Sequence, residues 1–157
     1  MAIQFSVVIP AHNEEAVIAL CLRSLEAMDY PRERYEVIVV DDASTDRTAE
    51  IAREFGARVI TEKCASIAAV RNRGAREARG EIIAHLDADM IVDPLWLKRA
   101  EEHYEAGLTG ALYFQDDVPE DASWIGRMWY GPFRADNSEV RHVDFLPTRN
   151  LFVPKAL

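Results

Sequence analysis

The chain has 157 residues, 49% of them apolar, and its 27 Asp and Glu residues outnumber its 18 Lys and Arg residues, which gives a formal net charge of −9. This length suits one domain, and the apolar content excludes disorder over most of the chain. The acidic balance argues against a nucleic-acid partner and against electrostatic anchoring to a membrane. A phosphorylated ligand stays open, because a bound divalent cation reverses the local charge of an acidic site.

The cysteines and the hydrophobic runs bear on the compartment. Cys21 and Cys64 lack CxxC spacing, so we expect two reduced thiols and neither a zinc site nor a redox motif. No run approaches the roughly 20 apolar residues that span a bilayer, and Met1–Phe5 does not resemble a signal peptide. We therefore expect a cytoplasmic domain with no membrane segment in this chain, with membrane association open if the natural protein continues beyond Leu157. The oligomeric state is not indicated.

Strand and helix patterns alternate along the first half of the chain. Short apolar or β-branched runs predict buried strands at Phe5–Ile9, Tyr35–Val40, Arg58–Ile60 and Glu81–Leu86. Apolar residues at helical spacing predict helices over Glu14–Met28, Ser44–Phe55 and Ser66–Arg79. In the first of these helices, Asn13 is the expected N-cap and Leu20 belongs to the expected buried stripe. Successive strand–helix units predict a mostly parallel sheet with helices on both faces.

The second half is less regular. Asp93-Pro94 predicts the start of a helix over Leu95–Glu105, with Trp96, Leu97 and Ala100 facing inward. Short strands are expected at Gly110–Gln115, His142–Leu146 and Arg149–Val153. Asp116–Asp136 is expected to be irregular. We interpret its aromatic stretch Trp124–Phe133 as a packed flap or an oligomer contact, in preference to a surface that stacks on a sugar or lipid acceptor. Without repeats or linkers, residues 1–157 are expected to form one domain.

Polar clusters follow three of the predicted strands. Pro10–Glu14 follows the first, Asp41–Asp46 the second and Asp87–Asp89 the fourth. The carboxyl ends of parallel strands share one edge of the sheet, which is where ligands bind in folds of this type. Because like charges gathered there repel one another, a cation or a hydrogen-bonding ligand is needed to offset the repulsion.

The spacing of Asp87 and Asp89 is the sharpest feature of these clusters. Two carboxylates two residues apart in an extended segment point the same way and can reach one cation. Mg²⁺ and Mn²⁺ prefer carboxylate, water and phosphate oxygens, so the pair of aspartates suggests a nucleotide substrate. The alternative interpretation of the pair is a solvated turn. Asp42 is our candidate for a ligand contact, whereas we expect Asp41 to bond loop amides and Asp46 to cap the next helix.

The basic residues and histidines are less specific. Arg71 suits either a contact with a base or phosphate or a surface basic segment, and Gly74 permits close packing. His12 is placed to contact a ribose or base, whereas His85 is expected to be a satisfied histidine of the sheet. Neither histidine has a second His or Cys at ligand spacing, so no zinc site is predicted.

Four segments together resemble the N-terminal part of glycosyltransferase family 2, which has the GT-A fold. They are SVVIPAHNEE at 6–15, VIVVDDASTDRTAEIA at 37–52, AAVRNRGAREARGEIIAHLDADM at 68–90 and, less closely, TRNLFVPK at 148–155. The resemblance implies a Rossmann-like α/β fold. It also implies transfer of a sugar from a nucleoside-diphosphate sugar, UDP- or GDP-linked, to an acceptor hydroxyl with inversion, using Mn²⁺ or Mg²⁺. The acceptor, whether carbohydrate, lipid or protein, is left open.

The resemblance also implies roles for individual residues. The first-strand loop lines the nucleoside pocket through Pro10, Ala11, His12, Asn13 and Glu14. Asp42 matches the carboxylate that binds the base, and Arg71 lies near the nucleotide. Asp87 points toward ribose and metal, Asp89 is the more direct metal ligand, and Asn150 holds the sugar or acceptor.

One departure concerns the catalytic base. The family carries a carboxylate for this role some way after the loop that holds Asn150, and neither Asp116 nor Asp144 stands in that context. We therefore expect either a truncated catalytic domain whose base lies beyond Leu157 or a base that is supplied elsewhere, and in both cases this chain alone is expected to be inactive.

Other functions are compatible with parts of the pattern. A sugar-nucleotide-forming nucleotidyltransferase would carry a glycine-rich basic loop where this chain has PAHNEE at 10–15. A nucleotide-sugar-binding domain without chemistry stays open because no base is assigned. A Rossmann dehydrogenase is excluded because GxGxxG is absent from the same loop.

Overall fold

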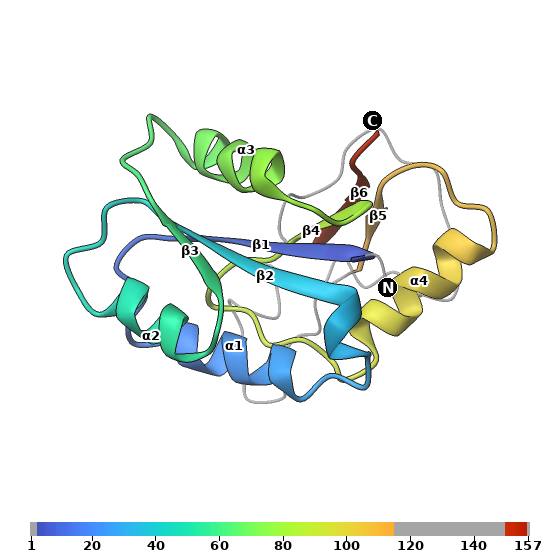
Figure 1. Cartoon of the computed structure of the whole chain (residues 1–157), viewed down its shortest axis with the longest axis horizontal. Helices are drawn as coiled ribbons and strands as arrows, with labels where there is room; N and C mark the ends of the chain where they lie inside the picture. Colours follow the sequence, from blue (N-terminus) through green and yellow to red (C-terminus); the bar gives the residue numbers. More distant parts are fainter. Residues whose placement is uncertain (1–2, 115–149, 157) are drawn as a thin grey trace, which may run out of the picture.

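A computed structural model describes residues 3–114 and 150–156, in which a six-stranded sheet has the order β3-β2-β1-β4-β6-β5 (Figure 1). The four parallel strands are β1 (Phe5–Ala11), β2 (Tyr35–Asp41), β3 (Arg58–Thr61) and β4 (Ile82–His85). Strand β6 (Leu151–Pro154) runs antiparallel to β4, and β5 (Leu112–Tyr113) runs antiparallel to β6. The sheet is therefore mixed and mostly parallel, and the α/β prediction is confirmed.

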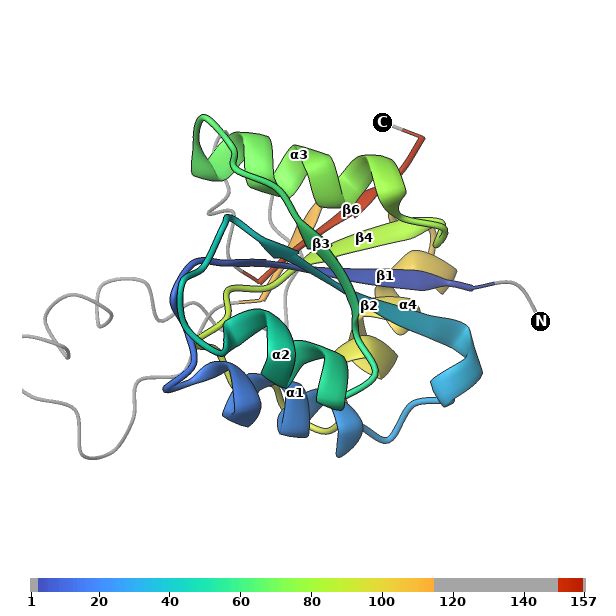
Figure 2. The ribbon, with the colours of Figure 1, turned by 60° about the vertical axis from the view of Figure 1, so that its left-hand side comes forward.

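Helices cover both faces of the sheet (Figures 1 and 2). Helices α1 (Ile18–Glu26), α2 (Thr48–Glu54) and α4 (Trp96–Glu105) contribute buried or packed residues to one apolar cluster, and α3 (Ile67–Glu77) contributes to a second cluster on the other face. A short 3-10 helix, η1 (Arg32–Arg34), precedes β2.

The period of two along β1 divides the core between these faces. Phe5, Val7 and Ile9 belong to the larger cluster, and Val8 belongs to the smaller one under α3. All four side chains are fully buried. Burial on both faces explains why the strand is apolar in the sequence apart from Ser6, whose hydroxyl bonds Glu36.

The helix starts differ from the predictions. Helix α1 begins at Ile18 and α2 at Thr48, about four residues later than expected in each case. Asn13 is not an N-cap, because its φ of +56° places it in the left-handed region and Val17 occupies the cap position. Asn13 and Ser44, which look like local caps in the sequence, bond each other across two loops instead.

The buried stripe of α1 also differs from the prediction. Its buried members are Ile18, Cys21, Leu22 and Leu25, whereas Leu20 is 51% exposed. In α4 the expected residues Trp96, Leu97 and Ala100 are buried.

In the described part of the second half, the predicted helix and two of the predicted strands are present, with different bounds for the strands. Strand β5 is shorter than predicted, and β6 begins two residues later than expected. The predicted strand at His142–Leu146 and the region Asp116–Asp136, including its aromatic stretch, lie outside the described residues. Within the described part of the chain, none of the helices has the length and hydropathy needed to cross a membrane.

Candidate active site

A hollow of about 310 Å³ lies at the carboxyl edge of the parallel strands, where the loops after β1 and β2 turn at the left of Figure 1. Its lining residues come from four separate segments: Pro10, Ala11, His12, Glu14, Asp42, Ile67, Val70, Arg71, Asp87, Ala88 and Asp89. We call it the carboxyl-edge hollow. The structure thus brings together all the predicted site residues except Asn13 and Asn150.

Two loops that form the hollow are joined by hydrogen bonds around Asn13. The Asn13 N–H donates to Ser44 Oγ at 2.9 Å, and the Thr45 N–H donates to Asn13 Oδ1 at 2.8 Å. His12 Nδ1 lies 2.7 Å from the Asp42 main-chain oxygen, and His12 Nε2 lies 3.2 Å from Asn13 Nδ2. Asn13 therefore binds protein groups beside the hollow and does not line it.

The same two loops are joined again at the start of α2. The Glu14 N–H donates to Thr48 Oγ1 at 2.7 Å, and the Glu15 N–H donates to Asp46 Oδ2 at 3.1 Å. In the reverse direction, the Arg47 N–H donates to Glu15 Oε2 at 3.0 Å. Asp46 Oδ1 also accepts the Thr48 N–H at 2.9 Å. Asp46 thus bonds the first turn of α2 as predicted, although Arg47, the next residue, occupies the N-cap position.

The two adjacent aspartates at the end of β2 have different surroundings. Asp41 is 1% exposed, and its Oδ1 accepts the Ser44 N–H at 3.3 Å, as expected for a structural role in the loop. Asp42 lines the hollow, and its Oδ1 accepts the Cys64 N–H at 2.7 Å. One oxygen of Asp42 is therefore fixed by the protein.

Arg71 extends from α3 to Asp87. Its Nη2 lies 2.6 Å from Asp87 Oδ1, and its side chain is 14% exposed. Arg71 Nε and the nearby His85 Nδ1 are buried without a hydrogen-bond partner among the described residues, so the expectation of a satisfied His85 is wrong there. Burial, followed by the charge of Arg71, lowers the pKa of His85 to about 4, which favours a neutral ring.

The carboxylates of the hollow affect one another. The pKa of Glu14 is raised, first by burial and then by the charges of Asp89, Asp46 and Asp87. Within residues 3–114 and 150–156, no three His, Cys, Asp or Glu side chains are grouped to hold a metal ion. The pair Asp87 and Asp89 fits a cation that takes its remaining ligands from water and phosphate oxygens.

Asn150 lies apart from the hollow and has a different environment. Its Oδ1 accepts the Trp96 Nε1–H at 2.7 Å, and its Nδ2 donates to the Phe114 carbonyl at 2.8 Å. The residue is 8% exposed. These bonds connect the start of β6 to α4 and to Phe114 after β5, and the contact of Asn150 with the sugar or acceptor stays a prediction.

Sequence reasoning missed two apolar lining residues. Ile67 and Val70 line the hollow from the first turns of α3, and Ile67 is 55% exposed. Because α3 follows β3, its beginning lies at the same carboxyl edge as the acidic loops. The chain order could have indicated these positions, although no polar signature marks them.

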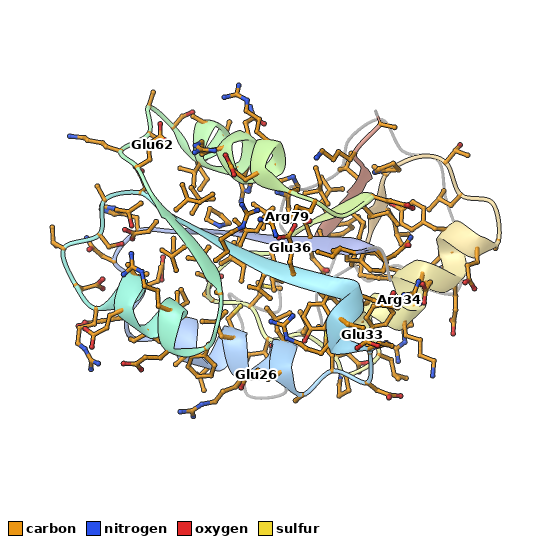
Figure 3. The ribbon with its side chains drawn as sticks, in the orientation of Figure 1. Glu26, Glu33, Arg34, Glu36, Glu62 and Arg79 are labelled. Atoms are coloured by element: carbon orange, nitrogen blue, oxygen red, sulfur yellow. The ribbon has the colours of Figure 1, made fainter. Side chains whose placement is uncertain are left out.

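A larger cavity of about 880 Å³ lies at the opposite, amino edge of the sheet. Its lining includes Arg34, Glu81, Tyr104 and Lys155. Arg34 is labelled at the right of Figure 3, on the side away from the loops of the carboxyl-edge hollow. None of the predicted site residues lines this cavity.

Comparison with known sequences gives a family match. A family model described as Glycosyl transferase family 2 matches residues 6–151. The chain is 31% identical over 175 aligned positions to poly(ribitol-phosphate) beta-N-acetylglucosaminyltransferase TarS of Staphylococcus aureus strain MW2, which covers 98% of this chain and 30% of TarS. The chain spans between 22% and 33% of the length of three curated relatives that it matches.

Solved structures agree with the sequence match. A crystal structure of S. aureus TarS residues 1–349 in complex with UDP-GlcNAc superposes with a TM-score of 0.71 and 28% identity, over 77% of this chain and 36% of that one. The mannosyltransferase PcManGT from Pyrobaculum calidifontis, in complex with GDP-Man and Mn²⁺, superposes with a TM-score of 0.69 and 28% identity, over 76% of this chain and 37% of that one. These similarities support the GT-A type of α/β fold.

Proposed function

From the premise that this chain belongs to glycosyltransferase family 2, we propose that it binds a nucleoside-diphosphate sugar in the carboxyl-edge hollow and transfers the sugar to an acceptor hydroxyl with inversion. The observation that carries the proposal is the convergence of Asp42, Asp87 and Asp89 on one hollow from two different strand ends. The structures of TarS and PcManGT, which contain UDP-GlcNAc and GDP-Man respectively, support the donor class.

In this proposal the nucleoside contacts the loops after β1 and β2. The Asp42 carboxylate accepts a hydrogen bond from the base, with its Oδ1 already held by the Cys64 N–H. His12 and Pro10 line the nucleoside side of the hollow, and Ile67 contributes apolar surface. Apolar side chains beside a small number of placed polar groups are usual at a small-molecule site, and here Ile67, Val70 and Pro10 lie beside the carboxylates.

The diphosphate is assigned to the end of β4, where Asp87 and Asp89 are the proposed holders of Mn²⁺ or Mg²⁺. Such a cation, when bound, supplies Lewis-acid stabilisation of the charge that develops on the departing diphosphate. Arg71 orients the Asp87 carboxylate through the 2.6 Å contact with Oδ1. No residue of this chain is assigned as the base that deprotonates the acceptor.

Binding of UDP with and without Mn²⁺, measured by calorimetry, tests the proposal. Asp89→Ala is expected to abolish Mn²⁺-dependent UDP binding and to leave the melting temperature unchanged. Glu54→Ala is the matched control, because it removes an exposed carboxylate on α2 that does not line the hollow. Undiminished Mn²⁺-dependent binding by the Asp89 variant would refute the metal assignment.

The reaction class needs a separate assay. Membership of a glycosyltransferase family argues against the sugar-nucleotide-forming nucleotidyltransferase. A domain that binds nucleotide sugars without turnover is the second candidate, because none of the described residues is assigned as the base that deprotonates the acceptor. Hydrolysis of UDP-GlcNAc or GDP-Man by this chain would support transferase chemistry, whereas tight binding without hydrolysis would support the second candidate.

A further inference from the structure

We propose that Asn13 is a positioning residue, which fixes the His12 ring in one tautomer and thereby holds the main chain of Asp42 beside the nucleotide. This inference rests on the proposed function for the identity of the ligand. The hydrogen-bond chain itself is a property of the protein without ligand, so the two can be tested separately.

The orientation of the Asn13 amide follows from its partners. The Thr45 N–H is a donor, so the Asn13 atom 2.8 Å away must be the acceptor Oδ1. The Asn13 Nδ2 group then faces His12 Nε2 at 3.2 Å. Because an amide NH₂ only donates, His12 Nε2 accepts this bond and carries no proton.

The second nitrogen of His12 completes the assignment. His12 Nδ1 lies 2.7 Å from the Asp42 carbonyl oxygen, which only accepts, so Nδ1 carries the proton. The ring is therefore the neutral Nδ1–H tautomer, set by its two partners. One chain of bonds runs from Asn13 through His12 to Asp42.

This chain acts on a residue that is already fixed on two other sides. The Asp42 N–H donates to the Ala11 carbonyl at 2.8 Å, and Asp42 Oδ1 accepts the Cys64 N–H at 2.7 Å. The bond from His12 holds the remaining main-chain oxygen. The three bonds together fix the carboxylate position before a ligand arrives, which lowers the ordering cost of binding.

The conformation of Asn13 makes this arrangement possible. Its φ of +56° lies in the left-handed region, which asparagine and glycine adopt more readily than other residues. The resulting bend places the Asn13 main chain on Ser44 Oγ and its side chain on the Thr45 N–H. Both ring nitrogens of His12 are engaged by protein groups, so a ligand in the hollow meets the carbon atoms of this ring.

The tautomer is measured without any ligand. Long-range ¹H–¹⁵N spectra distinguish Nδ1–H from Nε2–H, and His12→Gln assigns the signals. We expect the Nδ1–H form in the native chain and an admixture of the Nε2–H form in Asn13→Gly, which keeps the backbone conformation but removes the amide, so that the Asp42 carbonyl alone favours Nδ1–H. An Nε2–H ring in the native chain, or an unchanged tautomer in the variant, overturns the inference.

The effect on binding is measured with UDP and Mn²⁺. We expect Asn13→Gly to weaken UDP binding about tenfold, or about 1.4 kcal/mol. Ser6→Ala is the matched control at the amino edge, where Ser6 Oγ accepts the Gly80 N–H at 2.9 Å and donates to Glu36 Oε1 at 2.7 Å, and Glu36 is labelled near Arg79 in Figure 3. Ser6→Ala should lower the melting temperature at least as much as Asn13→Gly does, and its affinity for UDP should stay within twofold of that of the native chain.

The outcomes separate the two proposals. Equal losses of affinity in Asn13→Gly and Ser6→Ala would overturn the positioning role, because general destabilisation would then explain both. If the native chain binds neither UDP nor GDP with Mn²⁺, the proposed function fails, and the tautomer measurement still decides whether Asn13 fixes His12. A native Nδ1–H ring that gains an admixture of the Nε2–H form in Asn13→Gly, together with the selective loss of affinity, supports the inference.

Discussion

Replacing Asp42 by asparagine tests which group of the nucleotide faces this side chain. Asp42 Oδ1 accepts the Cys64 N–H at 2.7 Å, and that donor still needs an acceptor in the variant. The asparagine oxygen will therefore turn toward Cys64, so its NH₂ group will face the carboxyl-edge hollow. A base that offers an N–H to Asp42 will meet a donor where it requires an acceptor.

The size of the effect follows from this reversal. A hydrogen bond to a charged group contributes about 1.5–3 kcal/mol, and the substitution removes it entirely. At about 1.4 kcal/mol for each factor of ten, the affinity for UDP should fall by roughly ten- to 150-fold. The fold should be retained, because the variant keeps the bond to Cys64.

Calorimetric titration with UDP in the presence of Mn²⁺ measures the loss, and thermal unfolding checks the fold. Glu54→Gln, which neutralises an exposed carboxylate on α2, controls for the change in net charge. Affinity equal to that of the native chain would refute the assignment of Asp42 to the base. Tighter binding by Asp42→Asn would show that the ligand presents an acceptor there.

Three further predictions concern the fold and its titrating groups. Gly74→Ala places a Cβ 2.3 Å from Val8 Cγ1. The overpacking should cost about 1–3 kcal/mol or more and outweigh the roughly 1 kcal/mol gained in helix propensity, so the urea midpoint of unfolding should fall. An unchanged midpoint would contradict this packing. Burial raises the pKa of Tyr104 from 10.0 to about 12, so its stabilising contribution is present below pH 10 and lost as pH rises toward 12. The free energy of unfolding, measured with urea between pH 9 and 11, should depend less steeply on pH in Tyr104→Phe than in the native chain. Equal slopes in the two proteins would count against this contribution of Tyr104. Burial raises the pKa of the Cys21 thiol to about 12. A thiol reagent should therefore label the partly exposed Cys64 first and Cys21 only on unfolding. Equal labelling rates for the two cysteines would be inconsistent with this structure.

The sequence predicts the sheet well because a strand that is buried on both faces consists mostly of consecutive apolar residues. Phe5–Ile9 and Tyr35–Val40 are apolar runs with one polar residue each, and they become the central strands β1 and β2. The helix starts were less accessible to local reasoning. Ser44 and Asn13 have the composition of caps, yet they bond each other across 31 positions of sequence, and no local pattern contains that information.

The site could be predicted as a location more reliably than as a set of contacts. The rule that ligands bind at the carboxyl ends of parallel strands placed Asp42, Asp87 and Asp89 on one edge, and all three line the hollow. Asn150 shows the limit of the approach, because its partner Trp96 is 54 positions away and the bond between them forms only in the folded chain.

The charge of the hollow leads to a last prediction, about cation dependence. Its lining holds the four carboxylates of Glu14, Asp42, Asp87 and Asp89 against the guanidinium of Arg71, a formal charge of −3 when all are ionised. A diphosphate entering alone would add negative charge to this surplus, whereas a divalent cation between the phosphate and Asp89 would offset it.

Uridine carries no phosphate, so its binding through Asp42 should be insensitive to the cation. We therefore expect that EDTA abolishes binding of UDP and changes the affinity for uridine by less than a factor of about two, as measured by calorimetry at constant ionic strength. UDP affinity that is the same in EDTA as in Mn²⁺ would mean that Arg71 and the protein amides alone neutralise the diphosphate, and the acidic loops would then need another explanation. Loss of uridine binding in EDTA would instead show that the cation organises the base side of the hollow.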